Sequence, residues 1–226
     1  MTSRLVAVNA GLGDPSSTRL LVDRLVEATS HACAGTGVTP EIRVIDVREL
    51  AVDIARSLTT GFAIGAASEA IEAVQDADGL IVASPVFNAS YSGLFKSFFD
   101  LVDIERMQGK PVLLAATGGS PRHSMVLDHA LRPLFSYLRA ATLPTGVYAA
   151  SQDWAGTSGD TAALSDRIER AAGELAAALD DGRGTPTQVR HSSPASPEVT
   201  DRRHAQQAAT EAAGIANFAR LLGETD

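Results

Sequence analysis

The sequence predicts an α/β fold in which a doubly wound parallel sheet of five strands, ordered 2-1-3-4-5, carries helices on both faces. Short apolar runs bounded by turn residues alternate with longer stretches of helical periodicity, which is the pattern of strands joined by helical crossovers. Three of the runs are apolar on consecutive residues, as strands are when both faces of a sheet are covered. These runs are LVAV at 5–8, LIVAS at 80–84 and PVLLAAT at 111–117.

The elements follow one another in a single domain with an extension. Strands are expected at residues 5–8, 42–47, 80–83, 112–116 and 146–150, and most of the intervals between them predict helices. The domain is expected to cover 1–181. Residues 182–200 are rich in proline, serine and glycine and predict a linker or surface excursion. Residues 201–226 regain apolar residues at helical spacing and predict a C-terminal helix.

Composition limits the classes of function. A chain of 226 residues with 45% hydrophobic residues can bury one full core. The formal net charge is −8 and no basic cluster is long enough to follow a nucleic-acid backbone, which argues against such a partner. The single cysteine, Cys33, excludes an internal disulfide and a paired-thiol metal site. No apolar stretch has the length of a membrane span or signal peptide, so we expect a cytoplasmic protein without a membrane partner.

The first candidate site follows the first expected strand, in NAGLGDPSSTRLLVDRL at 9–25. This stretch nearly matches the dinucleotide fingerprint G-x-G-x-x-G, but Ser16 stands in place of the third glycine, and the lysine of a P-loop is missing. Ser16, Ser17 and Thr18 lie where a helix begins. Their hydroxyls and the backbone N–H groups could hold a phosphate, or a serine could simply cap the helix.

A dinucleotide site is the less favoured alternative. Asp46, at the end of the second expected strand, could bond a ribose hydroxyl. However, Asp46 lies much further along the chain than the usual spacing of about 20 residues, and the missing glycine would press the helix away from the strand.

Two more candidate stretches follow the third and fourth expected strands, at the sheet edge where ligands bind in doubly wound folds. In PVFNASYSG at 85–93, Pro85 is expected to end the strand and Asn88 to adopt a turn. The small residues after Asn88 would let a flat ligand approach the backbone, although Phe87 and Tyr91 could instead fill the core. Thr117, Gly118, Gly119 and Ser120 offer a second pliable, polar turn. All three stretches are expected to meet in one crevice.

Taken together, three sequence blocks resemble the NADPH-dependent FMN reductase family, which has a flavodoxin-like fold, and within it the branch that includes alkanesulfonate-linked FMN reductases. These blocks are PSSTR in the opening loop, SPVFNASYSGLFKSFFDLV, and GKPVLLAATGGSPRHSMVLDHALRPLFSYLRA. The resemblance covers about residues 3–150. The first loop departs from the family pattern, in which Gly-Ser is more often followed by Arg, because AGLGDP intervenes.

The resemblance implies an FMN site with named residues. Ser16, Ser17 and Thr18 would hold the phosphate. The isoalloxazine ring would be lined on one edge by Pro85, Val86, Phe87 and Asn88, and on the other by Thr117, Gly118, Gly119 and Ser120.

The resemblance also implies an activity, the transfer of a hydride from nicotinamide C4 of NADPH, or NADH, to flavin N5. Reduced FMN would then pass to a partner monooxygenase. Two alternatives stay open: a quinone or azo reductase that keeps its FMN, and a non-catalytic electron carrier. No catalytic acid, base or nucleophile and no metal site is expected, because no His, Cys, Asp and Glu grouping has metal-ligand spacing and no Ser, His and Asp set has the context of a nucleophile. This favours a flavin enzyme, in which the cofactor carries the chemistry.

An oligomer is expected as well. The helices predicted at 93–103 and 125–139 carry apolar residues on more than one side, and members of the resembled family typically pair through such helices. We therefore expect a homodimer or homotetramer.

Overall fold

The computed structural model describes residues 2–154 and 160–181, with 160–162 described by their backbone alone. The segments predicted as a linker at 182–200 and a helix at 201–226 lie outside the described residues. In the part of the chain that the structure describes, no helix has both the length and the apolar character needed to cross a membrane.

The predicted α/β class and parallel core are confirmed. The strands are β1 (Thr2–Asn9), β2 (Thr39–Asp46), β3 (Gly79–Phe87), β4 (Ser90–Tyr91), β5 (Pro111–Gly118), β6 (Ala141–Thr142) and β7 (Val147–Ala150). Within the described residues they form one sheet of seven strands ordered β2-β1-β3-β5-β6, in which β4 also pairs with β3 and β7 with β5. Every pairing is parallel except that of β3 with β4.

The sheet differs from the expected five strands in two ways. First, the fifth strand is split into β6 and β7, which both pair with β5. The backbone N–H of Leu143 still donates to Val112 (3.0 Å), but Pro144 has no N–H and the ladder resumes only at Val147. Second, β3 runs on through Pro85, so the prediction that this proline ends the strand was wrong. Pairing with β1 stops at Ala83, and Pro85 is therefore tolerated where one edge of β3 has no long partner strand.

Beyond Pro85 the chain forms a tight hairpin. Val86 pairs with Tyr91 and Phe87 with Ser90, which leaves Asn88 and Ala89 as the two turn residues. Both have positive φ, 48° at Asn88 and 64° at Ala89, as a two-residue hairpin of the primed type requires. The expected turn at Asn88 is thus present, and Ala89 accepts a left-handed conformation that costs an ordinary residue about 1–2 kcal/mol.

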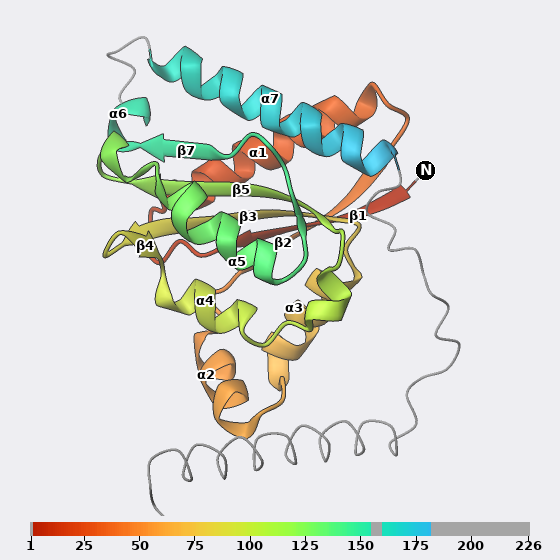
Figure 1. Ribbon diagram of the computed structural model, residues 1–226, viewed down its shortest axis with the longest axis vertical. Helices are drawn as coiled ribbons and strands as arrows, with labels where there is room; N and C mark the ends of the chain where they lie inside the picture. Colours follow the sequence, from red (N-terminus) through yellow and green to blue (C-terminus); the bar gives the residue numbers. More distant parts are fainter. Residues whose placement is uncertain (1, 155–159, 182–226) are drawn as a thin grey trace, which may run out of the picture. The chain divides into compact units, whose positions relative to one another are not determined.

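Helices cover both faces of the sheet (Figure 1). On one face lie α1 (Ser17–Ala34) and α7 (Asp160–Asp180); on the other lie α3 (Gly65–Asp76), α4 (Gly93–Phe99) and α5 (Arg132–Tyr137), with α2 (Ala51–Thr60) packed against α3 and α4. The shorter α6 (Ser151–Trp154) follows β7. Alternate residues of β3 serve the two cores: Leu80 and Val82 pack with α3 to α5, whereas Ile81 and Ala83 pack with α1 and α7.

The helix predicted at 125–139 is not a uniform α-helix. A turn of 3₁₀-helix at Pro121–His123 is followed by a π-helical turn at Leu127–Leu131, in which the N–H of Arg132 donates to Leu127, and only then by α5. Pro133 lies in the first turn of α5, where its missing N–H is tolerated. The helix predicted at 93–103 likewise ends early, at Phe99.

The apolar residues that suggested an oligomer mostly belong to the chain's own core. Phe95, Phe98, Phe99 and Phe135 are buried and their rings contact one another, with centroids 4.7 to 6.3 Å apart. The reason given for pairing was therefore largely wrong, because these side chains already have partners within one chain.

One buried charge holds the sheet to α3. Lys110, which directly precedes β5, is 3% exposed, and its Nζ donates to the carbonyls of Val74 (2.6 Å) and Gln75 (2.8 Å) in the last turn of α3. Burial, with the positive charge of Arg106 nearby, lowers the pKa of Lys110 from 10.5 to about 8. Lys110 thus caps the C-terminal end of α3, but burying its charged ammonium group costs free energy of desolvation.

This cost makes stability depend on pH. Because the pKa is lower in the folded than in the unfolded state, the contribution of Lys110 to the free energy of unfolding is expected to rise as pH increases from about 8 to 10.5, by up to about 3 kcal/mol. Lys110→Met should abolish the rise, as measured by urea unfolding across this pH range. Lys96→Met, at a half-exposed lysine, is the control and should keep it. An unchanged rise in Lys110→Met would contradict this assignment.

Candidate functional site

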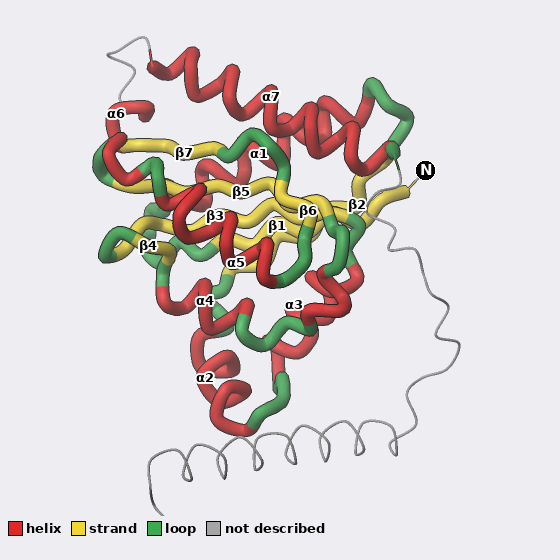
Figure 2. The backbone as a smooth tube through the Cα atoms, in the orientation of Figure 1, coloured by secondary structure: helices red, strands yellow, loops and turns green. Residues whose placement is uncertain are grey.

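The three candidate stretches lie together at the carboxyl edge of the sheet. The strands β1, β3 and β5 are parallel neighbours and end on the same side, where the β3–β4 hairpin also lies (Figure 2). The Thr18 hydroxyl lies 2.8 Å from that of Thr117, which joins the first stretch to the third. Pro85 pairs with Thr117 in the β3–β5 register, which places the second stretch beside the third.

The three hydroxyls of the opening loop have different environments. Ser16 is the N-cap of α1, and its Oγ accepts a hydrogen bond from the N–H of Arg19 (3.2 Å). Thr18 is buried and bonds to Thr117. Ser17 is the first residue of α1 and is exposed. Helix capping therefore belongs to Ser16, whereas Ser17 presents its hydroxyl to solvent at a helix N-terminus, where anions are favoured.

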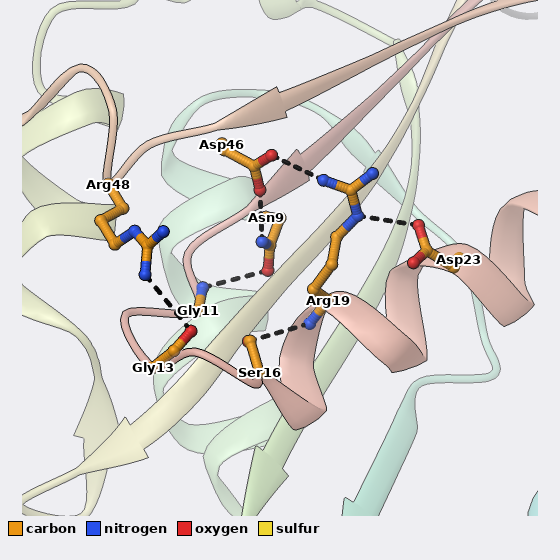
Figure 3. A network of polar contacts seen from close by, with 8 residues as sticks. All are labelled: Asn9, Gly11, Gly13, Ser16, Arg19, Asp23, Asp46 and Arg48. Carbon is orange, nitrogen blue, oxygen red and sulfur yellow. Dashed lines mark hydrogen bonds and ion pairs between the residues drawn. The ribbon is translucent and has the colours of Figure 1, made fainter.

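The backbone of the opening loop is held from behind by Asn9, which is 3% exposed (Figure 3). Its Oδ1 accepts from the N–H of Gly11 (3.0 Å), and its Nδ2 donates to Asp46 (2.5 Å). A Cβ on Gly11 would lie 2.0 Å from the Ser16 Oγ, so a side chain at this position would displace the hydroxyl that caps α1. The loop therefore has a fixed shape that begins with the last residue of β1.

Two arginines complete this network (Figure 3). Arg19 donates to Asp46 (2.6 Å) and to Asp23 (2.8 Å), and these partners, the Asp23 hydrogen bond first, raise the pKa of its guanidinium. Arg48 donates to the carbonyl oxygens of Leu12 (3.3 Å) and Gly13 (3.5 Å). Both oxygens of Asp46 are thus engaged by Asn9 and Arg19, which weakens further the alternative that Asp46 binds a ribose.

A cavity of about 350 Å³ lies against this network. It is lined in part by two arginines and four acidic residues: Arg19, Arg48, Asp14, Asp23, Asp46 and Glu49. The cavity offers no net positive charge to an anion. At the start of α1, by contrast, stand the exposed Ser17 and first-turn N–H groups that have no partner within the helix.

The second stretch is shaped by buried serines. Ser84 Oγ accepts from the N–H of Ser92 (2.9 Å) and donates to the carbonyl of Pro85 (2.9 Å), so the hairpin is tied at its base. Ser92 also caps α4. Phe87 is 46% exposed and does not fill the core, whereas Tyr91 is half-buried against it. The exposed face of the hairpin therefore combines an aromatic ring with a strained turn.

The third stretch is a turn held by a residue that sequence reasoning missed. Tyr148 of β7 donates through its Oη to the carbonyl of Ser120 (2.6 Å). Thr117 is buried, and an added Cβ on Gly119 would meet no atom within 4 Å, so the backbone of this turn is open to a ligand. Asn9 and Arg19 lie within the first candidate stretch, but their partners, and the roles of Arg48 and Tyr148, appear only in the folded chain.

Metal chemistry has no support among the described residues, where no three His, Cys, Asp or Glu side chains gather as a metal site requires. The one cysteine, Cys33, is buried, and burial raises the pKa of its thiol, which makes it a poor nucleophile.

Comparison with known proteins gives consistent matches. The model of the family "NADPH-dependent FMN reductase" matches residues 3–155. FMN reductase (NADPH) of Pseudomonas aeruginosa is 42% identical over 185 residues, which cover 81% of this chain and 96% of that protein. NADH-dependent FMN reductase SfnF of Pseudomonas fluorescens is 42% identical over 177 residues, covering 78% and 91%.

Two solved structures of oxidoreductases are also similar to this chain. An oxidoreductase from Corynebacterium diphtheriae has a TM-score of 0.76 and 44% identity, with 80% of this chain and 98% of that chain covered. The apo form of the NADH:FMN oxidoreductase EMOB has a TM-score of 0.66 and 29% identity, with 76% and 90% covered. The family match spans all three loops at the carboxyl edge. This chain therefore belongs to the NADPH-dependent FMN reductase family.

Proposed function

We propose that this chain is an NAD(P)H-dependent FMN reductase whose flavin site is formed by the three loops at the carboxyl edge of β1, β3 and β5. The observation that supports it most is the contact between these loops, through the Thr18–Thr117 hydroxyl pair (2.8 Å) and the pairing of Pro85 with Thr117, in a member of this family.

The residues at this edge have the chemistry that FMN requires. The phosphate needs donors, and α1 begins with N–H groups that have no partner within the helix, the exposed Ser17 hydroxyl and the capping Ser16. The flat ring needs open backbone, which the turn from Thr117 to Ser120 supplies at Gly119. On the other edge, Pro85, Val86, Phe87 and Asn88 supply a half-exposed hairpin face.

The Thr18–Thr117 pair leaves a donor for the ligand. Two hydroxyls that share one hydrogen bond use one of their two protons, so the second is free to donate to a neighbouring acceptor. Thr18 and Thr117 would therefore act as one unit, with Thr18 on the phosphate side and Thr117 on the ring side.

Bound FMN supplies the redox chemistry, since flavin N5 accepts a hydride from nicotinamide C4. The task of the chain is to bind both molecules and to bring donor and acceptor within about 3 to 3.5 Å of each other. Relatives are named for NADPH and for NADH, so either coenzyme is a candidate here. We further propose that reduced FMN leaves for a partner monooxygenase and that the protein works in the cytoplasm, in keeping with its single buried, unpaired cysteine.

The activity is tested by mixing the purified protein with FMN and NADPH, or NADH, and following nicotinamide absorbance with and without a quinone. FMN reductase activity predicts rapid coenzyme oxidation that depends on FMN and needs no quinone. Oxidation only when a quinone is added would instead indicate a quinone reductase. Tight flavin binding without coenzyme oxidation would indicate an electron carrier and contradict the proposal.

The phosphate site is tested by comparing FMN with riboflavin, which lacks the phosphate. Ser17→Ala removes a hydrogen bond to a charged group, expected to cost about 1.5 to 3 kcal/mol, so FMN binding should weaken by about ten- to a hundredfold while riboflavin binding is unchanged. The control, Ser30→Ala, removes a serine hydroxyl near the other end of α1 and should leave both flavin affinities unchanged. Equal weakening of both flavins by Ser17→Ala would place the phosphate elsewhere.

We also propose that the protein forms a homodimer or homotetramer. The contact surface proposed is smaller than the two whole helices that the sequence suggested. A groove of about 510 Å³ between α4 and α5 is lined mostly by apolar side chains, among them Leu134 and Tyr137, together with the charged Lys96 and Asp100. Tyr137 is 72% exposed. Tyr137→Glu would place a charge in this surface, and light scattering should show dissociation relative to Tyr137→Phe. A monomeric mass for the wild-type protein at micromolar concentration would contradict the proposal.

A further inference from the structure

The turn from Gly118 to Ser120 is fixed by a side chain from a different strand. Tyr148, in the middle of β7, is 4% exposed and donates its hydroxyl to the carbonyl of Ser120 at 2.6 Å. Burial, followed by the negative charge of Asp153, raises the pKa of this hydroxyl, so it stays protonated and remains a donor at neutral pH.

Gly118 and Tyr148 are complementary. A Cβ on Gly118 would lie 2.3 Å from the Tyr148 Oη and 3.3 Å from its Cζ, so a side chain at 118 and the hydroxyl at 148 compete for one space. Gly118 itself pairs with Ala150 at the end of β7. The absence of a side chain at 118 is what allows the tyrosine hydroxyl to reach the turn.

Tyr148 is in turn held by charged groups from the next elements. The guanidinium of Arg167 in α7 donates to the Tyr148 carbonyl (2.7 Å) and lies 3.6 Å from Asp153, which is 5% exposed. Asp153 accepts from the N–H of Ala150 (2.7 Å). Arg167 and Asp153 thus fix the end of β7. Because Tyr148 is held in place there, its hydroxyl holds the Gly118–Ser120 turn in a defined position.

We propose that Tyr148 is a positioning residue for flavin binding: its hydroxyl holds the Gly118–Ser120 turn in the place where the turn meets the flavin ring. The proposal rests on the proposed function, in which this turn lines the ring. Tyr148 touches only the chain's own backbone and acts through Ser120. Because its effect is on the ring side of the site, it differs from that of Ser17, which acts on the phosphate.

This difference defines the experiment. Tyr148→Phe keeps the ring and removes only the hydroxyl, and it should weaken FMN and riboflavin equally, by about three- to tenfold, as measured by flavin fluorescence titration. Thr145→Val is the matched control. It removes another hydroxyl hydrogen bond, from Thr145 to Glu174 (2.6 Å), just before β7 begins, and should leave both flavin affinities at the wild-type value.

A second variant tests the pairing directly. Gly118→Ala should weaken both flavins, because the new methyl group displaces the tyrosine hydroxyl or the turn. In the double variant Gly118→Ala with Tyr148→Phe, the hydroxyl at 2.3 Å is gone, and the nearest ring atom to the new methyl group is Cζ of residue 148, at 3.3 Å. Flavin affinity should therefore equal that of Tyr148→Phe alone and not fall further.

The outcomes are distinct. If Tyr148→Phe lowers thermal stability but leaves both flavin affinities unchanged, or weakens FMN alone, the positioning role is wrong. If the losses of the two single variants simply add in the double variant, the pairing of positions 118 and 148 is wrong. Failure of the wild-type protein to bind either flavin would instead contradict the proposed function itself.

Discussion

The site depends on one buried hydrogen bond, between the hydroxyls of Thr18 and Thr117, which lie 99 residues apart in the chain. Thr18 belongs to the first turn of α1 and Thr117 to the end of β5, so the bond joins the loops at two strands that are separated in the sheet by β3. Both threonines are almost fully buried, and a buried hydroxyl without a partner would cost about 1–3 kcal/mol. The parallel order of the strands is what brings the two partners within reach.

Around this bond, each loop is held by hydrogen bonds to the chain's own side chains. Asn9 and Asp46 hold the opening loop, Ser84 ties the base of the hairpin, and Tyr148 holds the last turn. Arg19 and Arg48 are engaged with carboxylates and carbonyls, so the donors left at the start of α1 are neutral hydroxyls and backbone N–H groups. The loops are therefore held partly by residues of the motifs themselves, such as Asn9 and Ser84, and partly by residues distant in sequence, such as Asp46 and Tyr148.

The local sequence pattern was sufficient to predict the buried strands, because a run of apolar residues has to be buried. Runs such as LIVAS must be covered on both faces, and Leu80 and Ile81 do enter the two opposite cores. The local pattern did not predict whether a proline ends a strand, because that depends on the neighbouring strand. Pro85 was expected to end β3 but is tolerated because β1 ends before it, whereas Pro144 does interrupt the last strand. The phenylalanines of α4 suggested an interface, but Phe95 and Phe99 pack on Phe135, about 40 residues further along the chain.

The sequence by itself determined the parallel α/β architecture, the three loops and the family they resemble, because apolar runs, turn residues and short motifs are local properties. Only the tertiary structure decided how the hydroxyls divide their tasks, with Ser16 as the cap, Thr18 as the buried partner of Thr117, and Ser17 exposed. It also revealed that Tyr148 holds the turn that Gly118 leaves open. The physical reason is that a hydrogen bond forms between whichever groups the fold brings within about 3 Å of each other, and sequence spacing does not encode that distance.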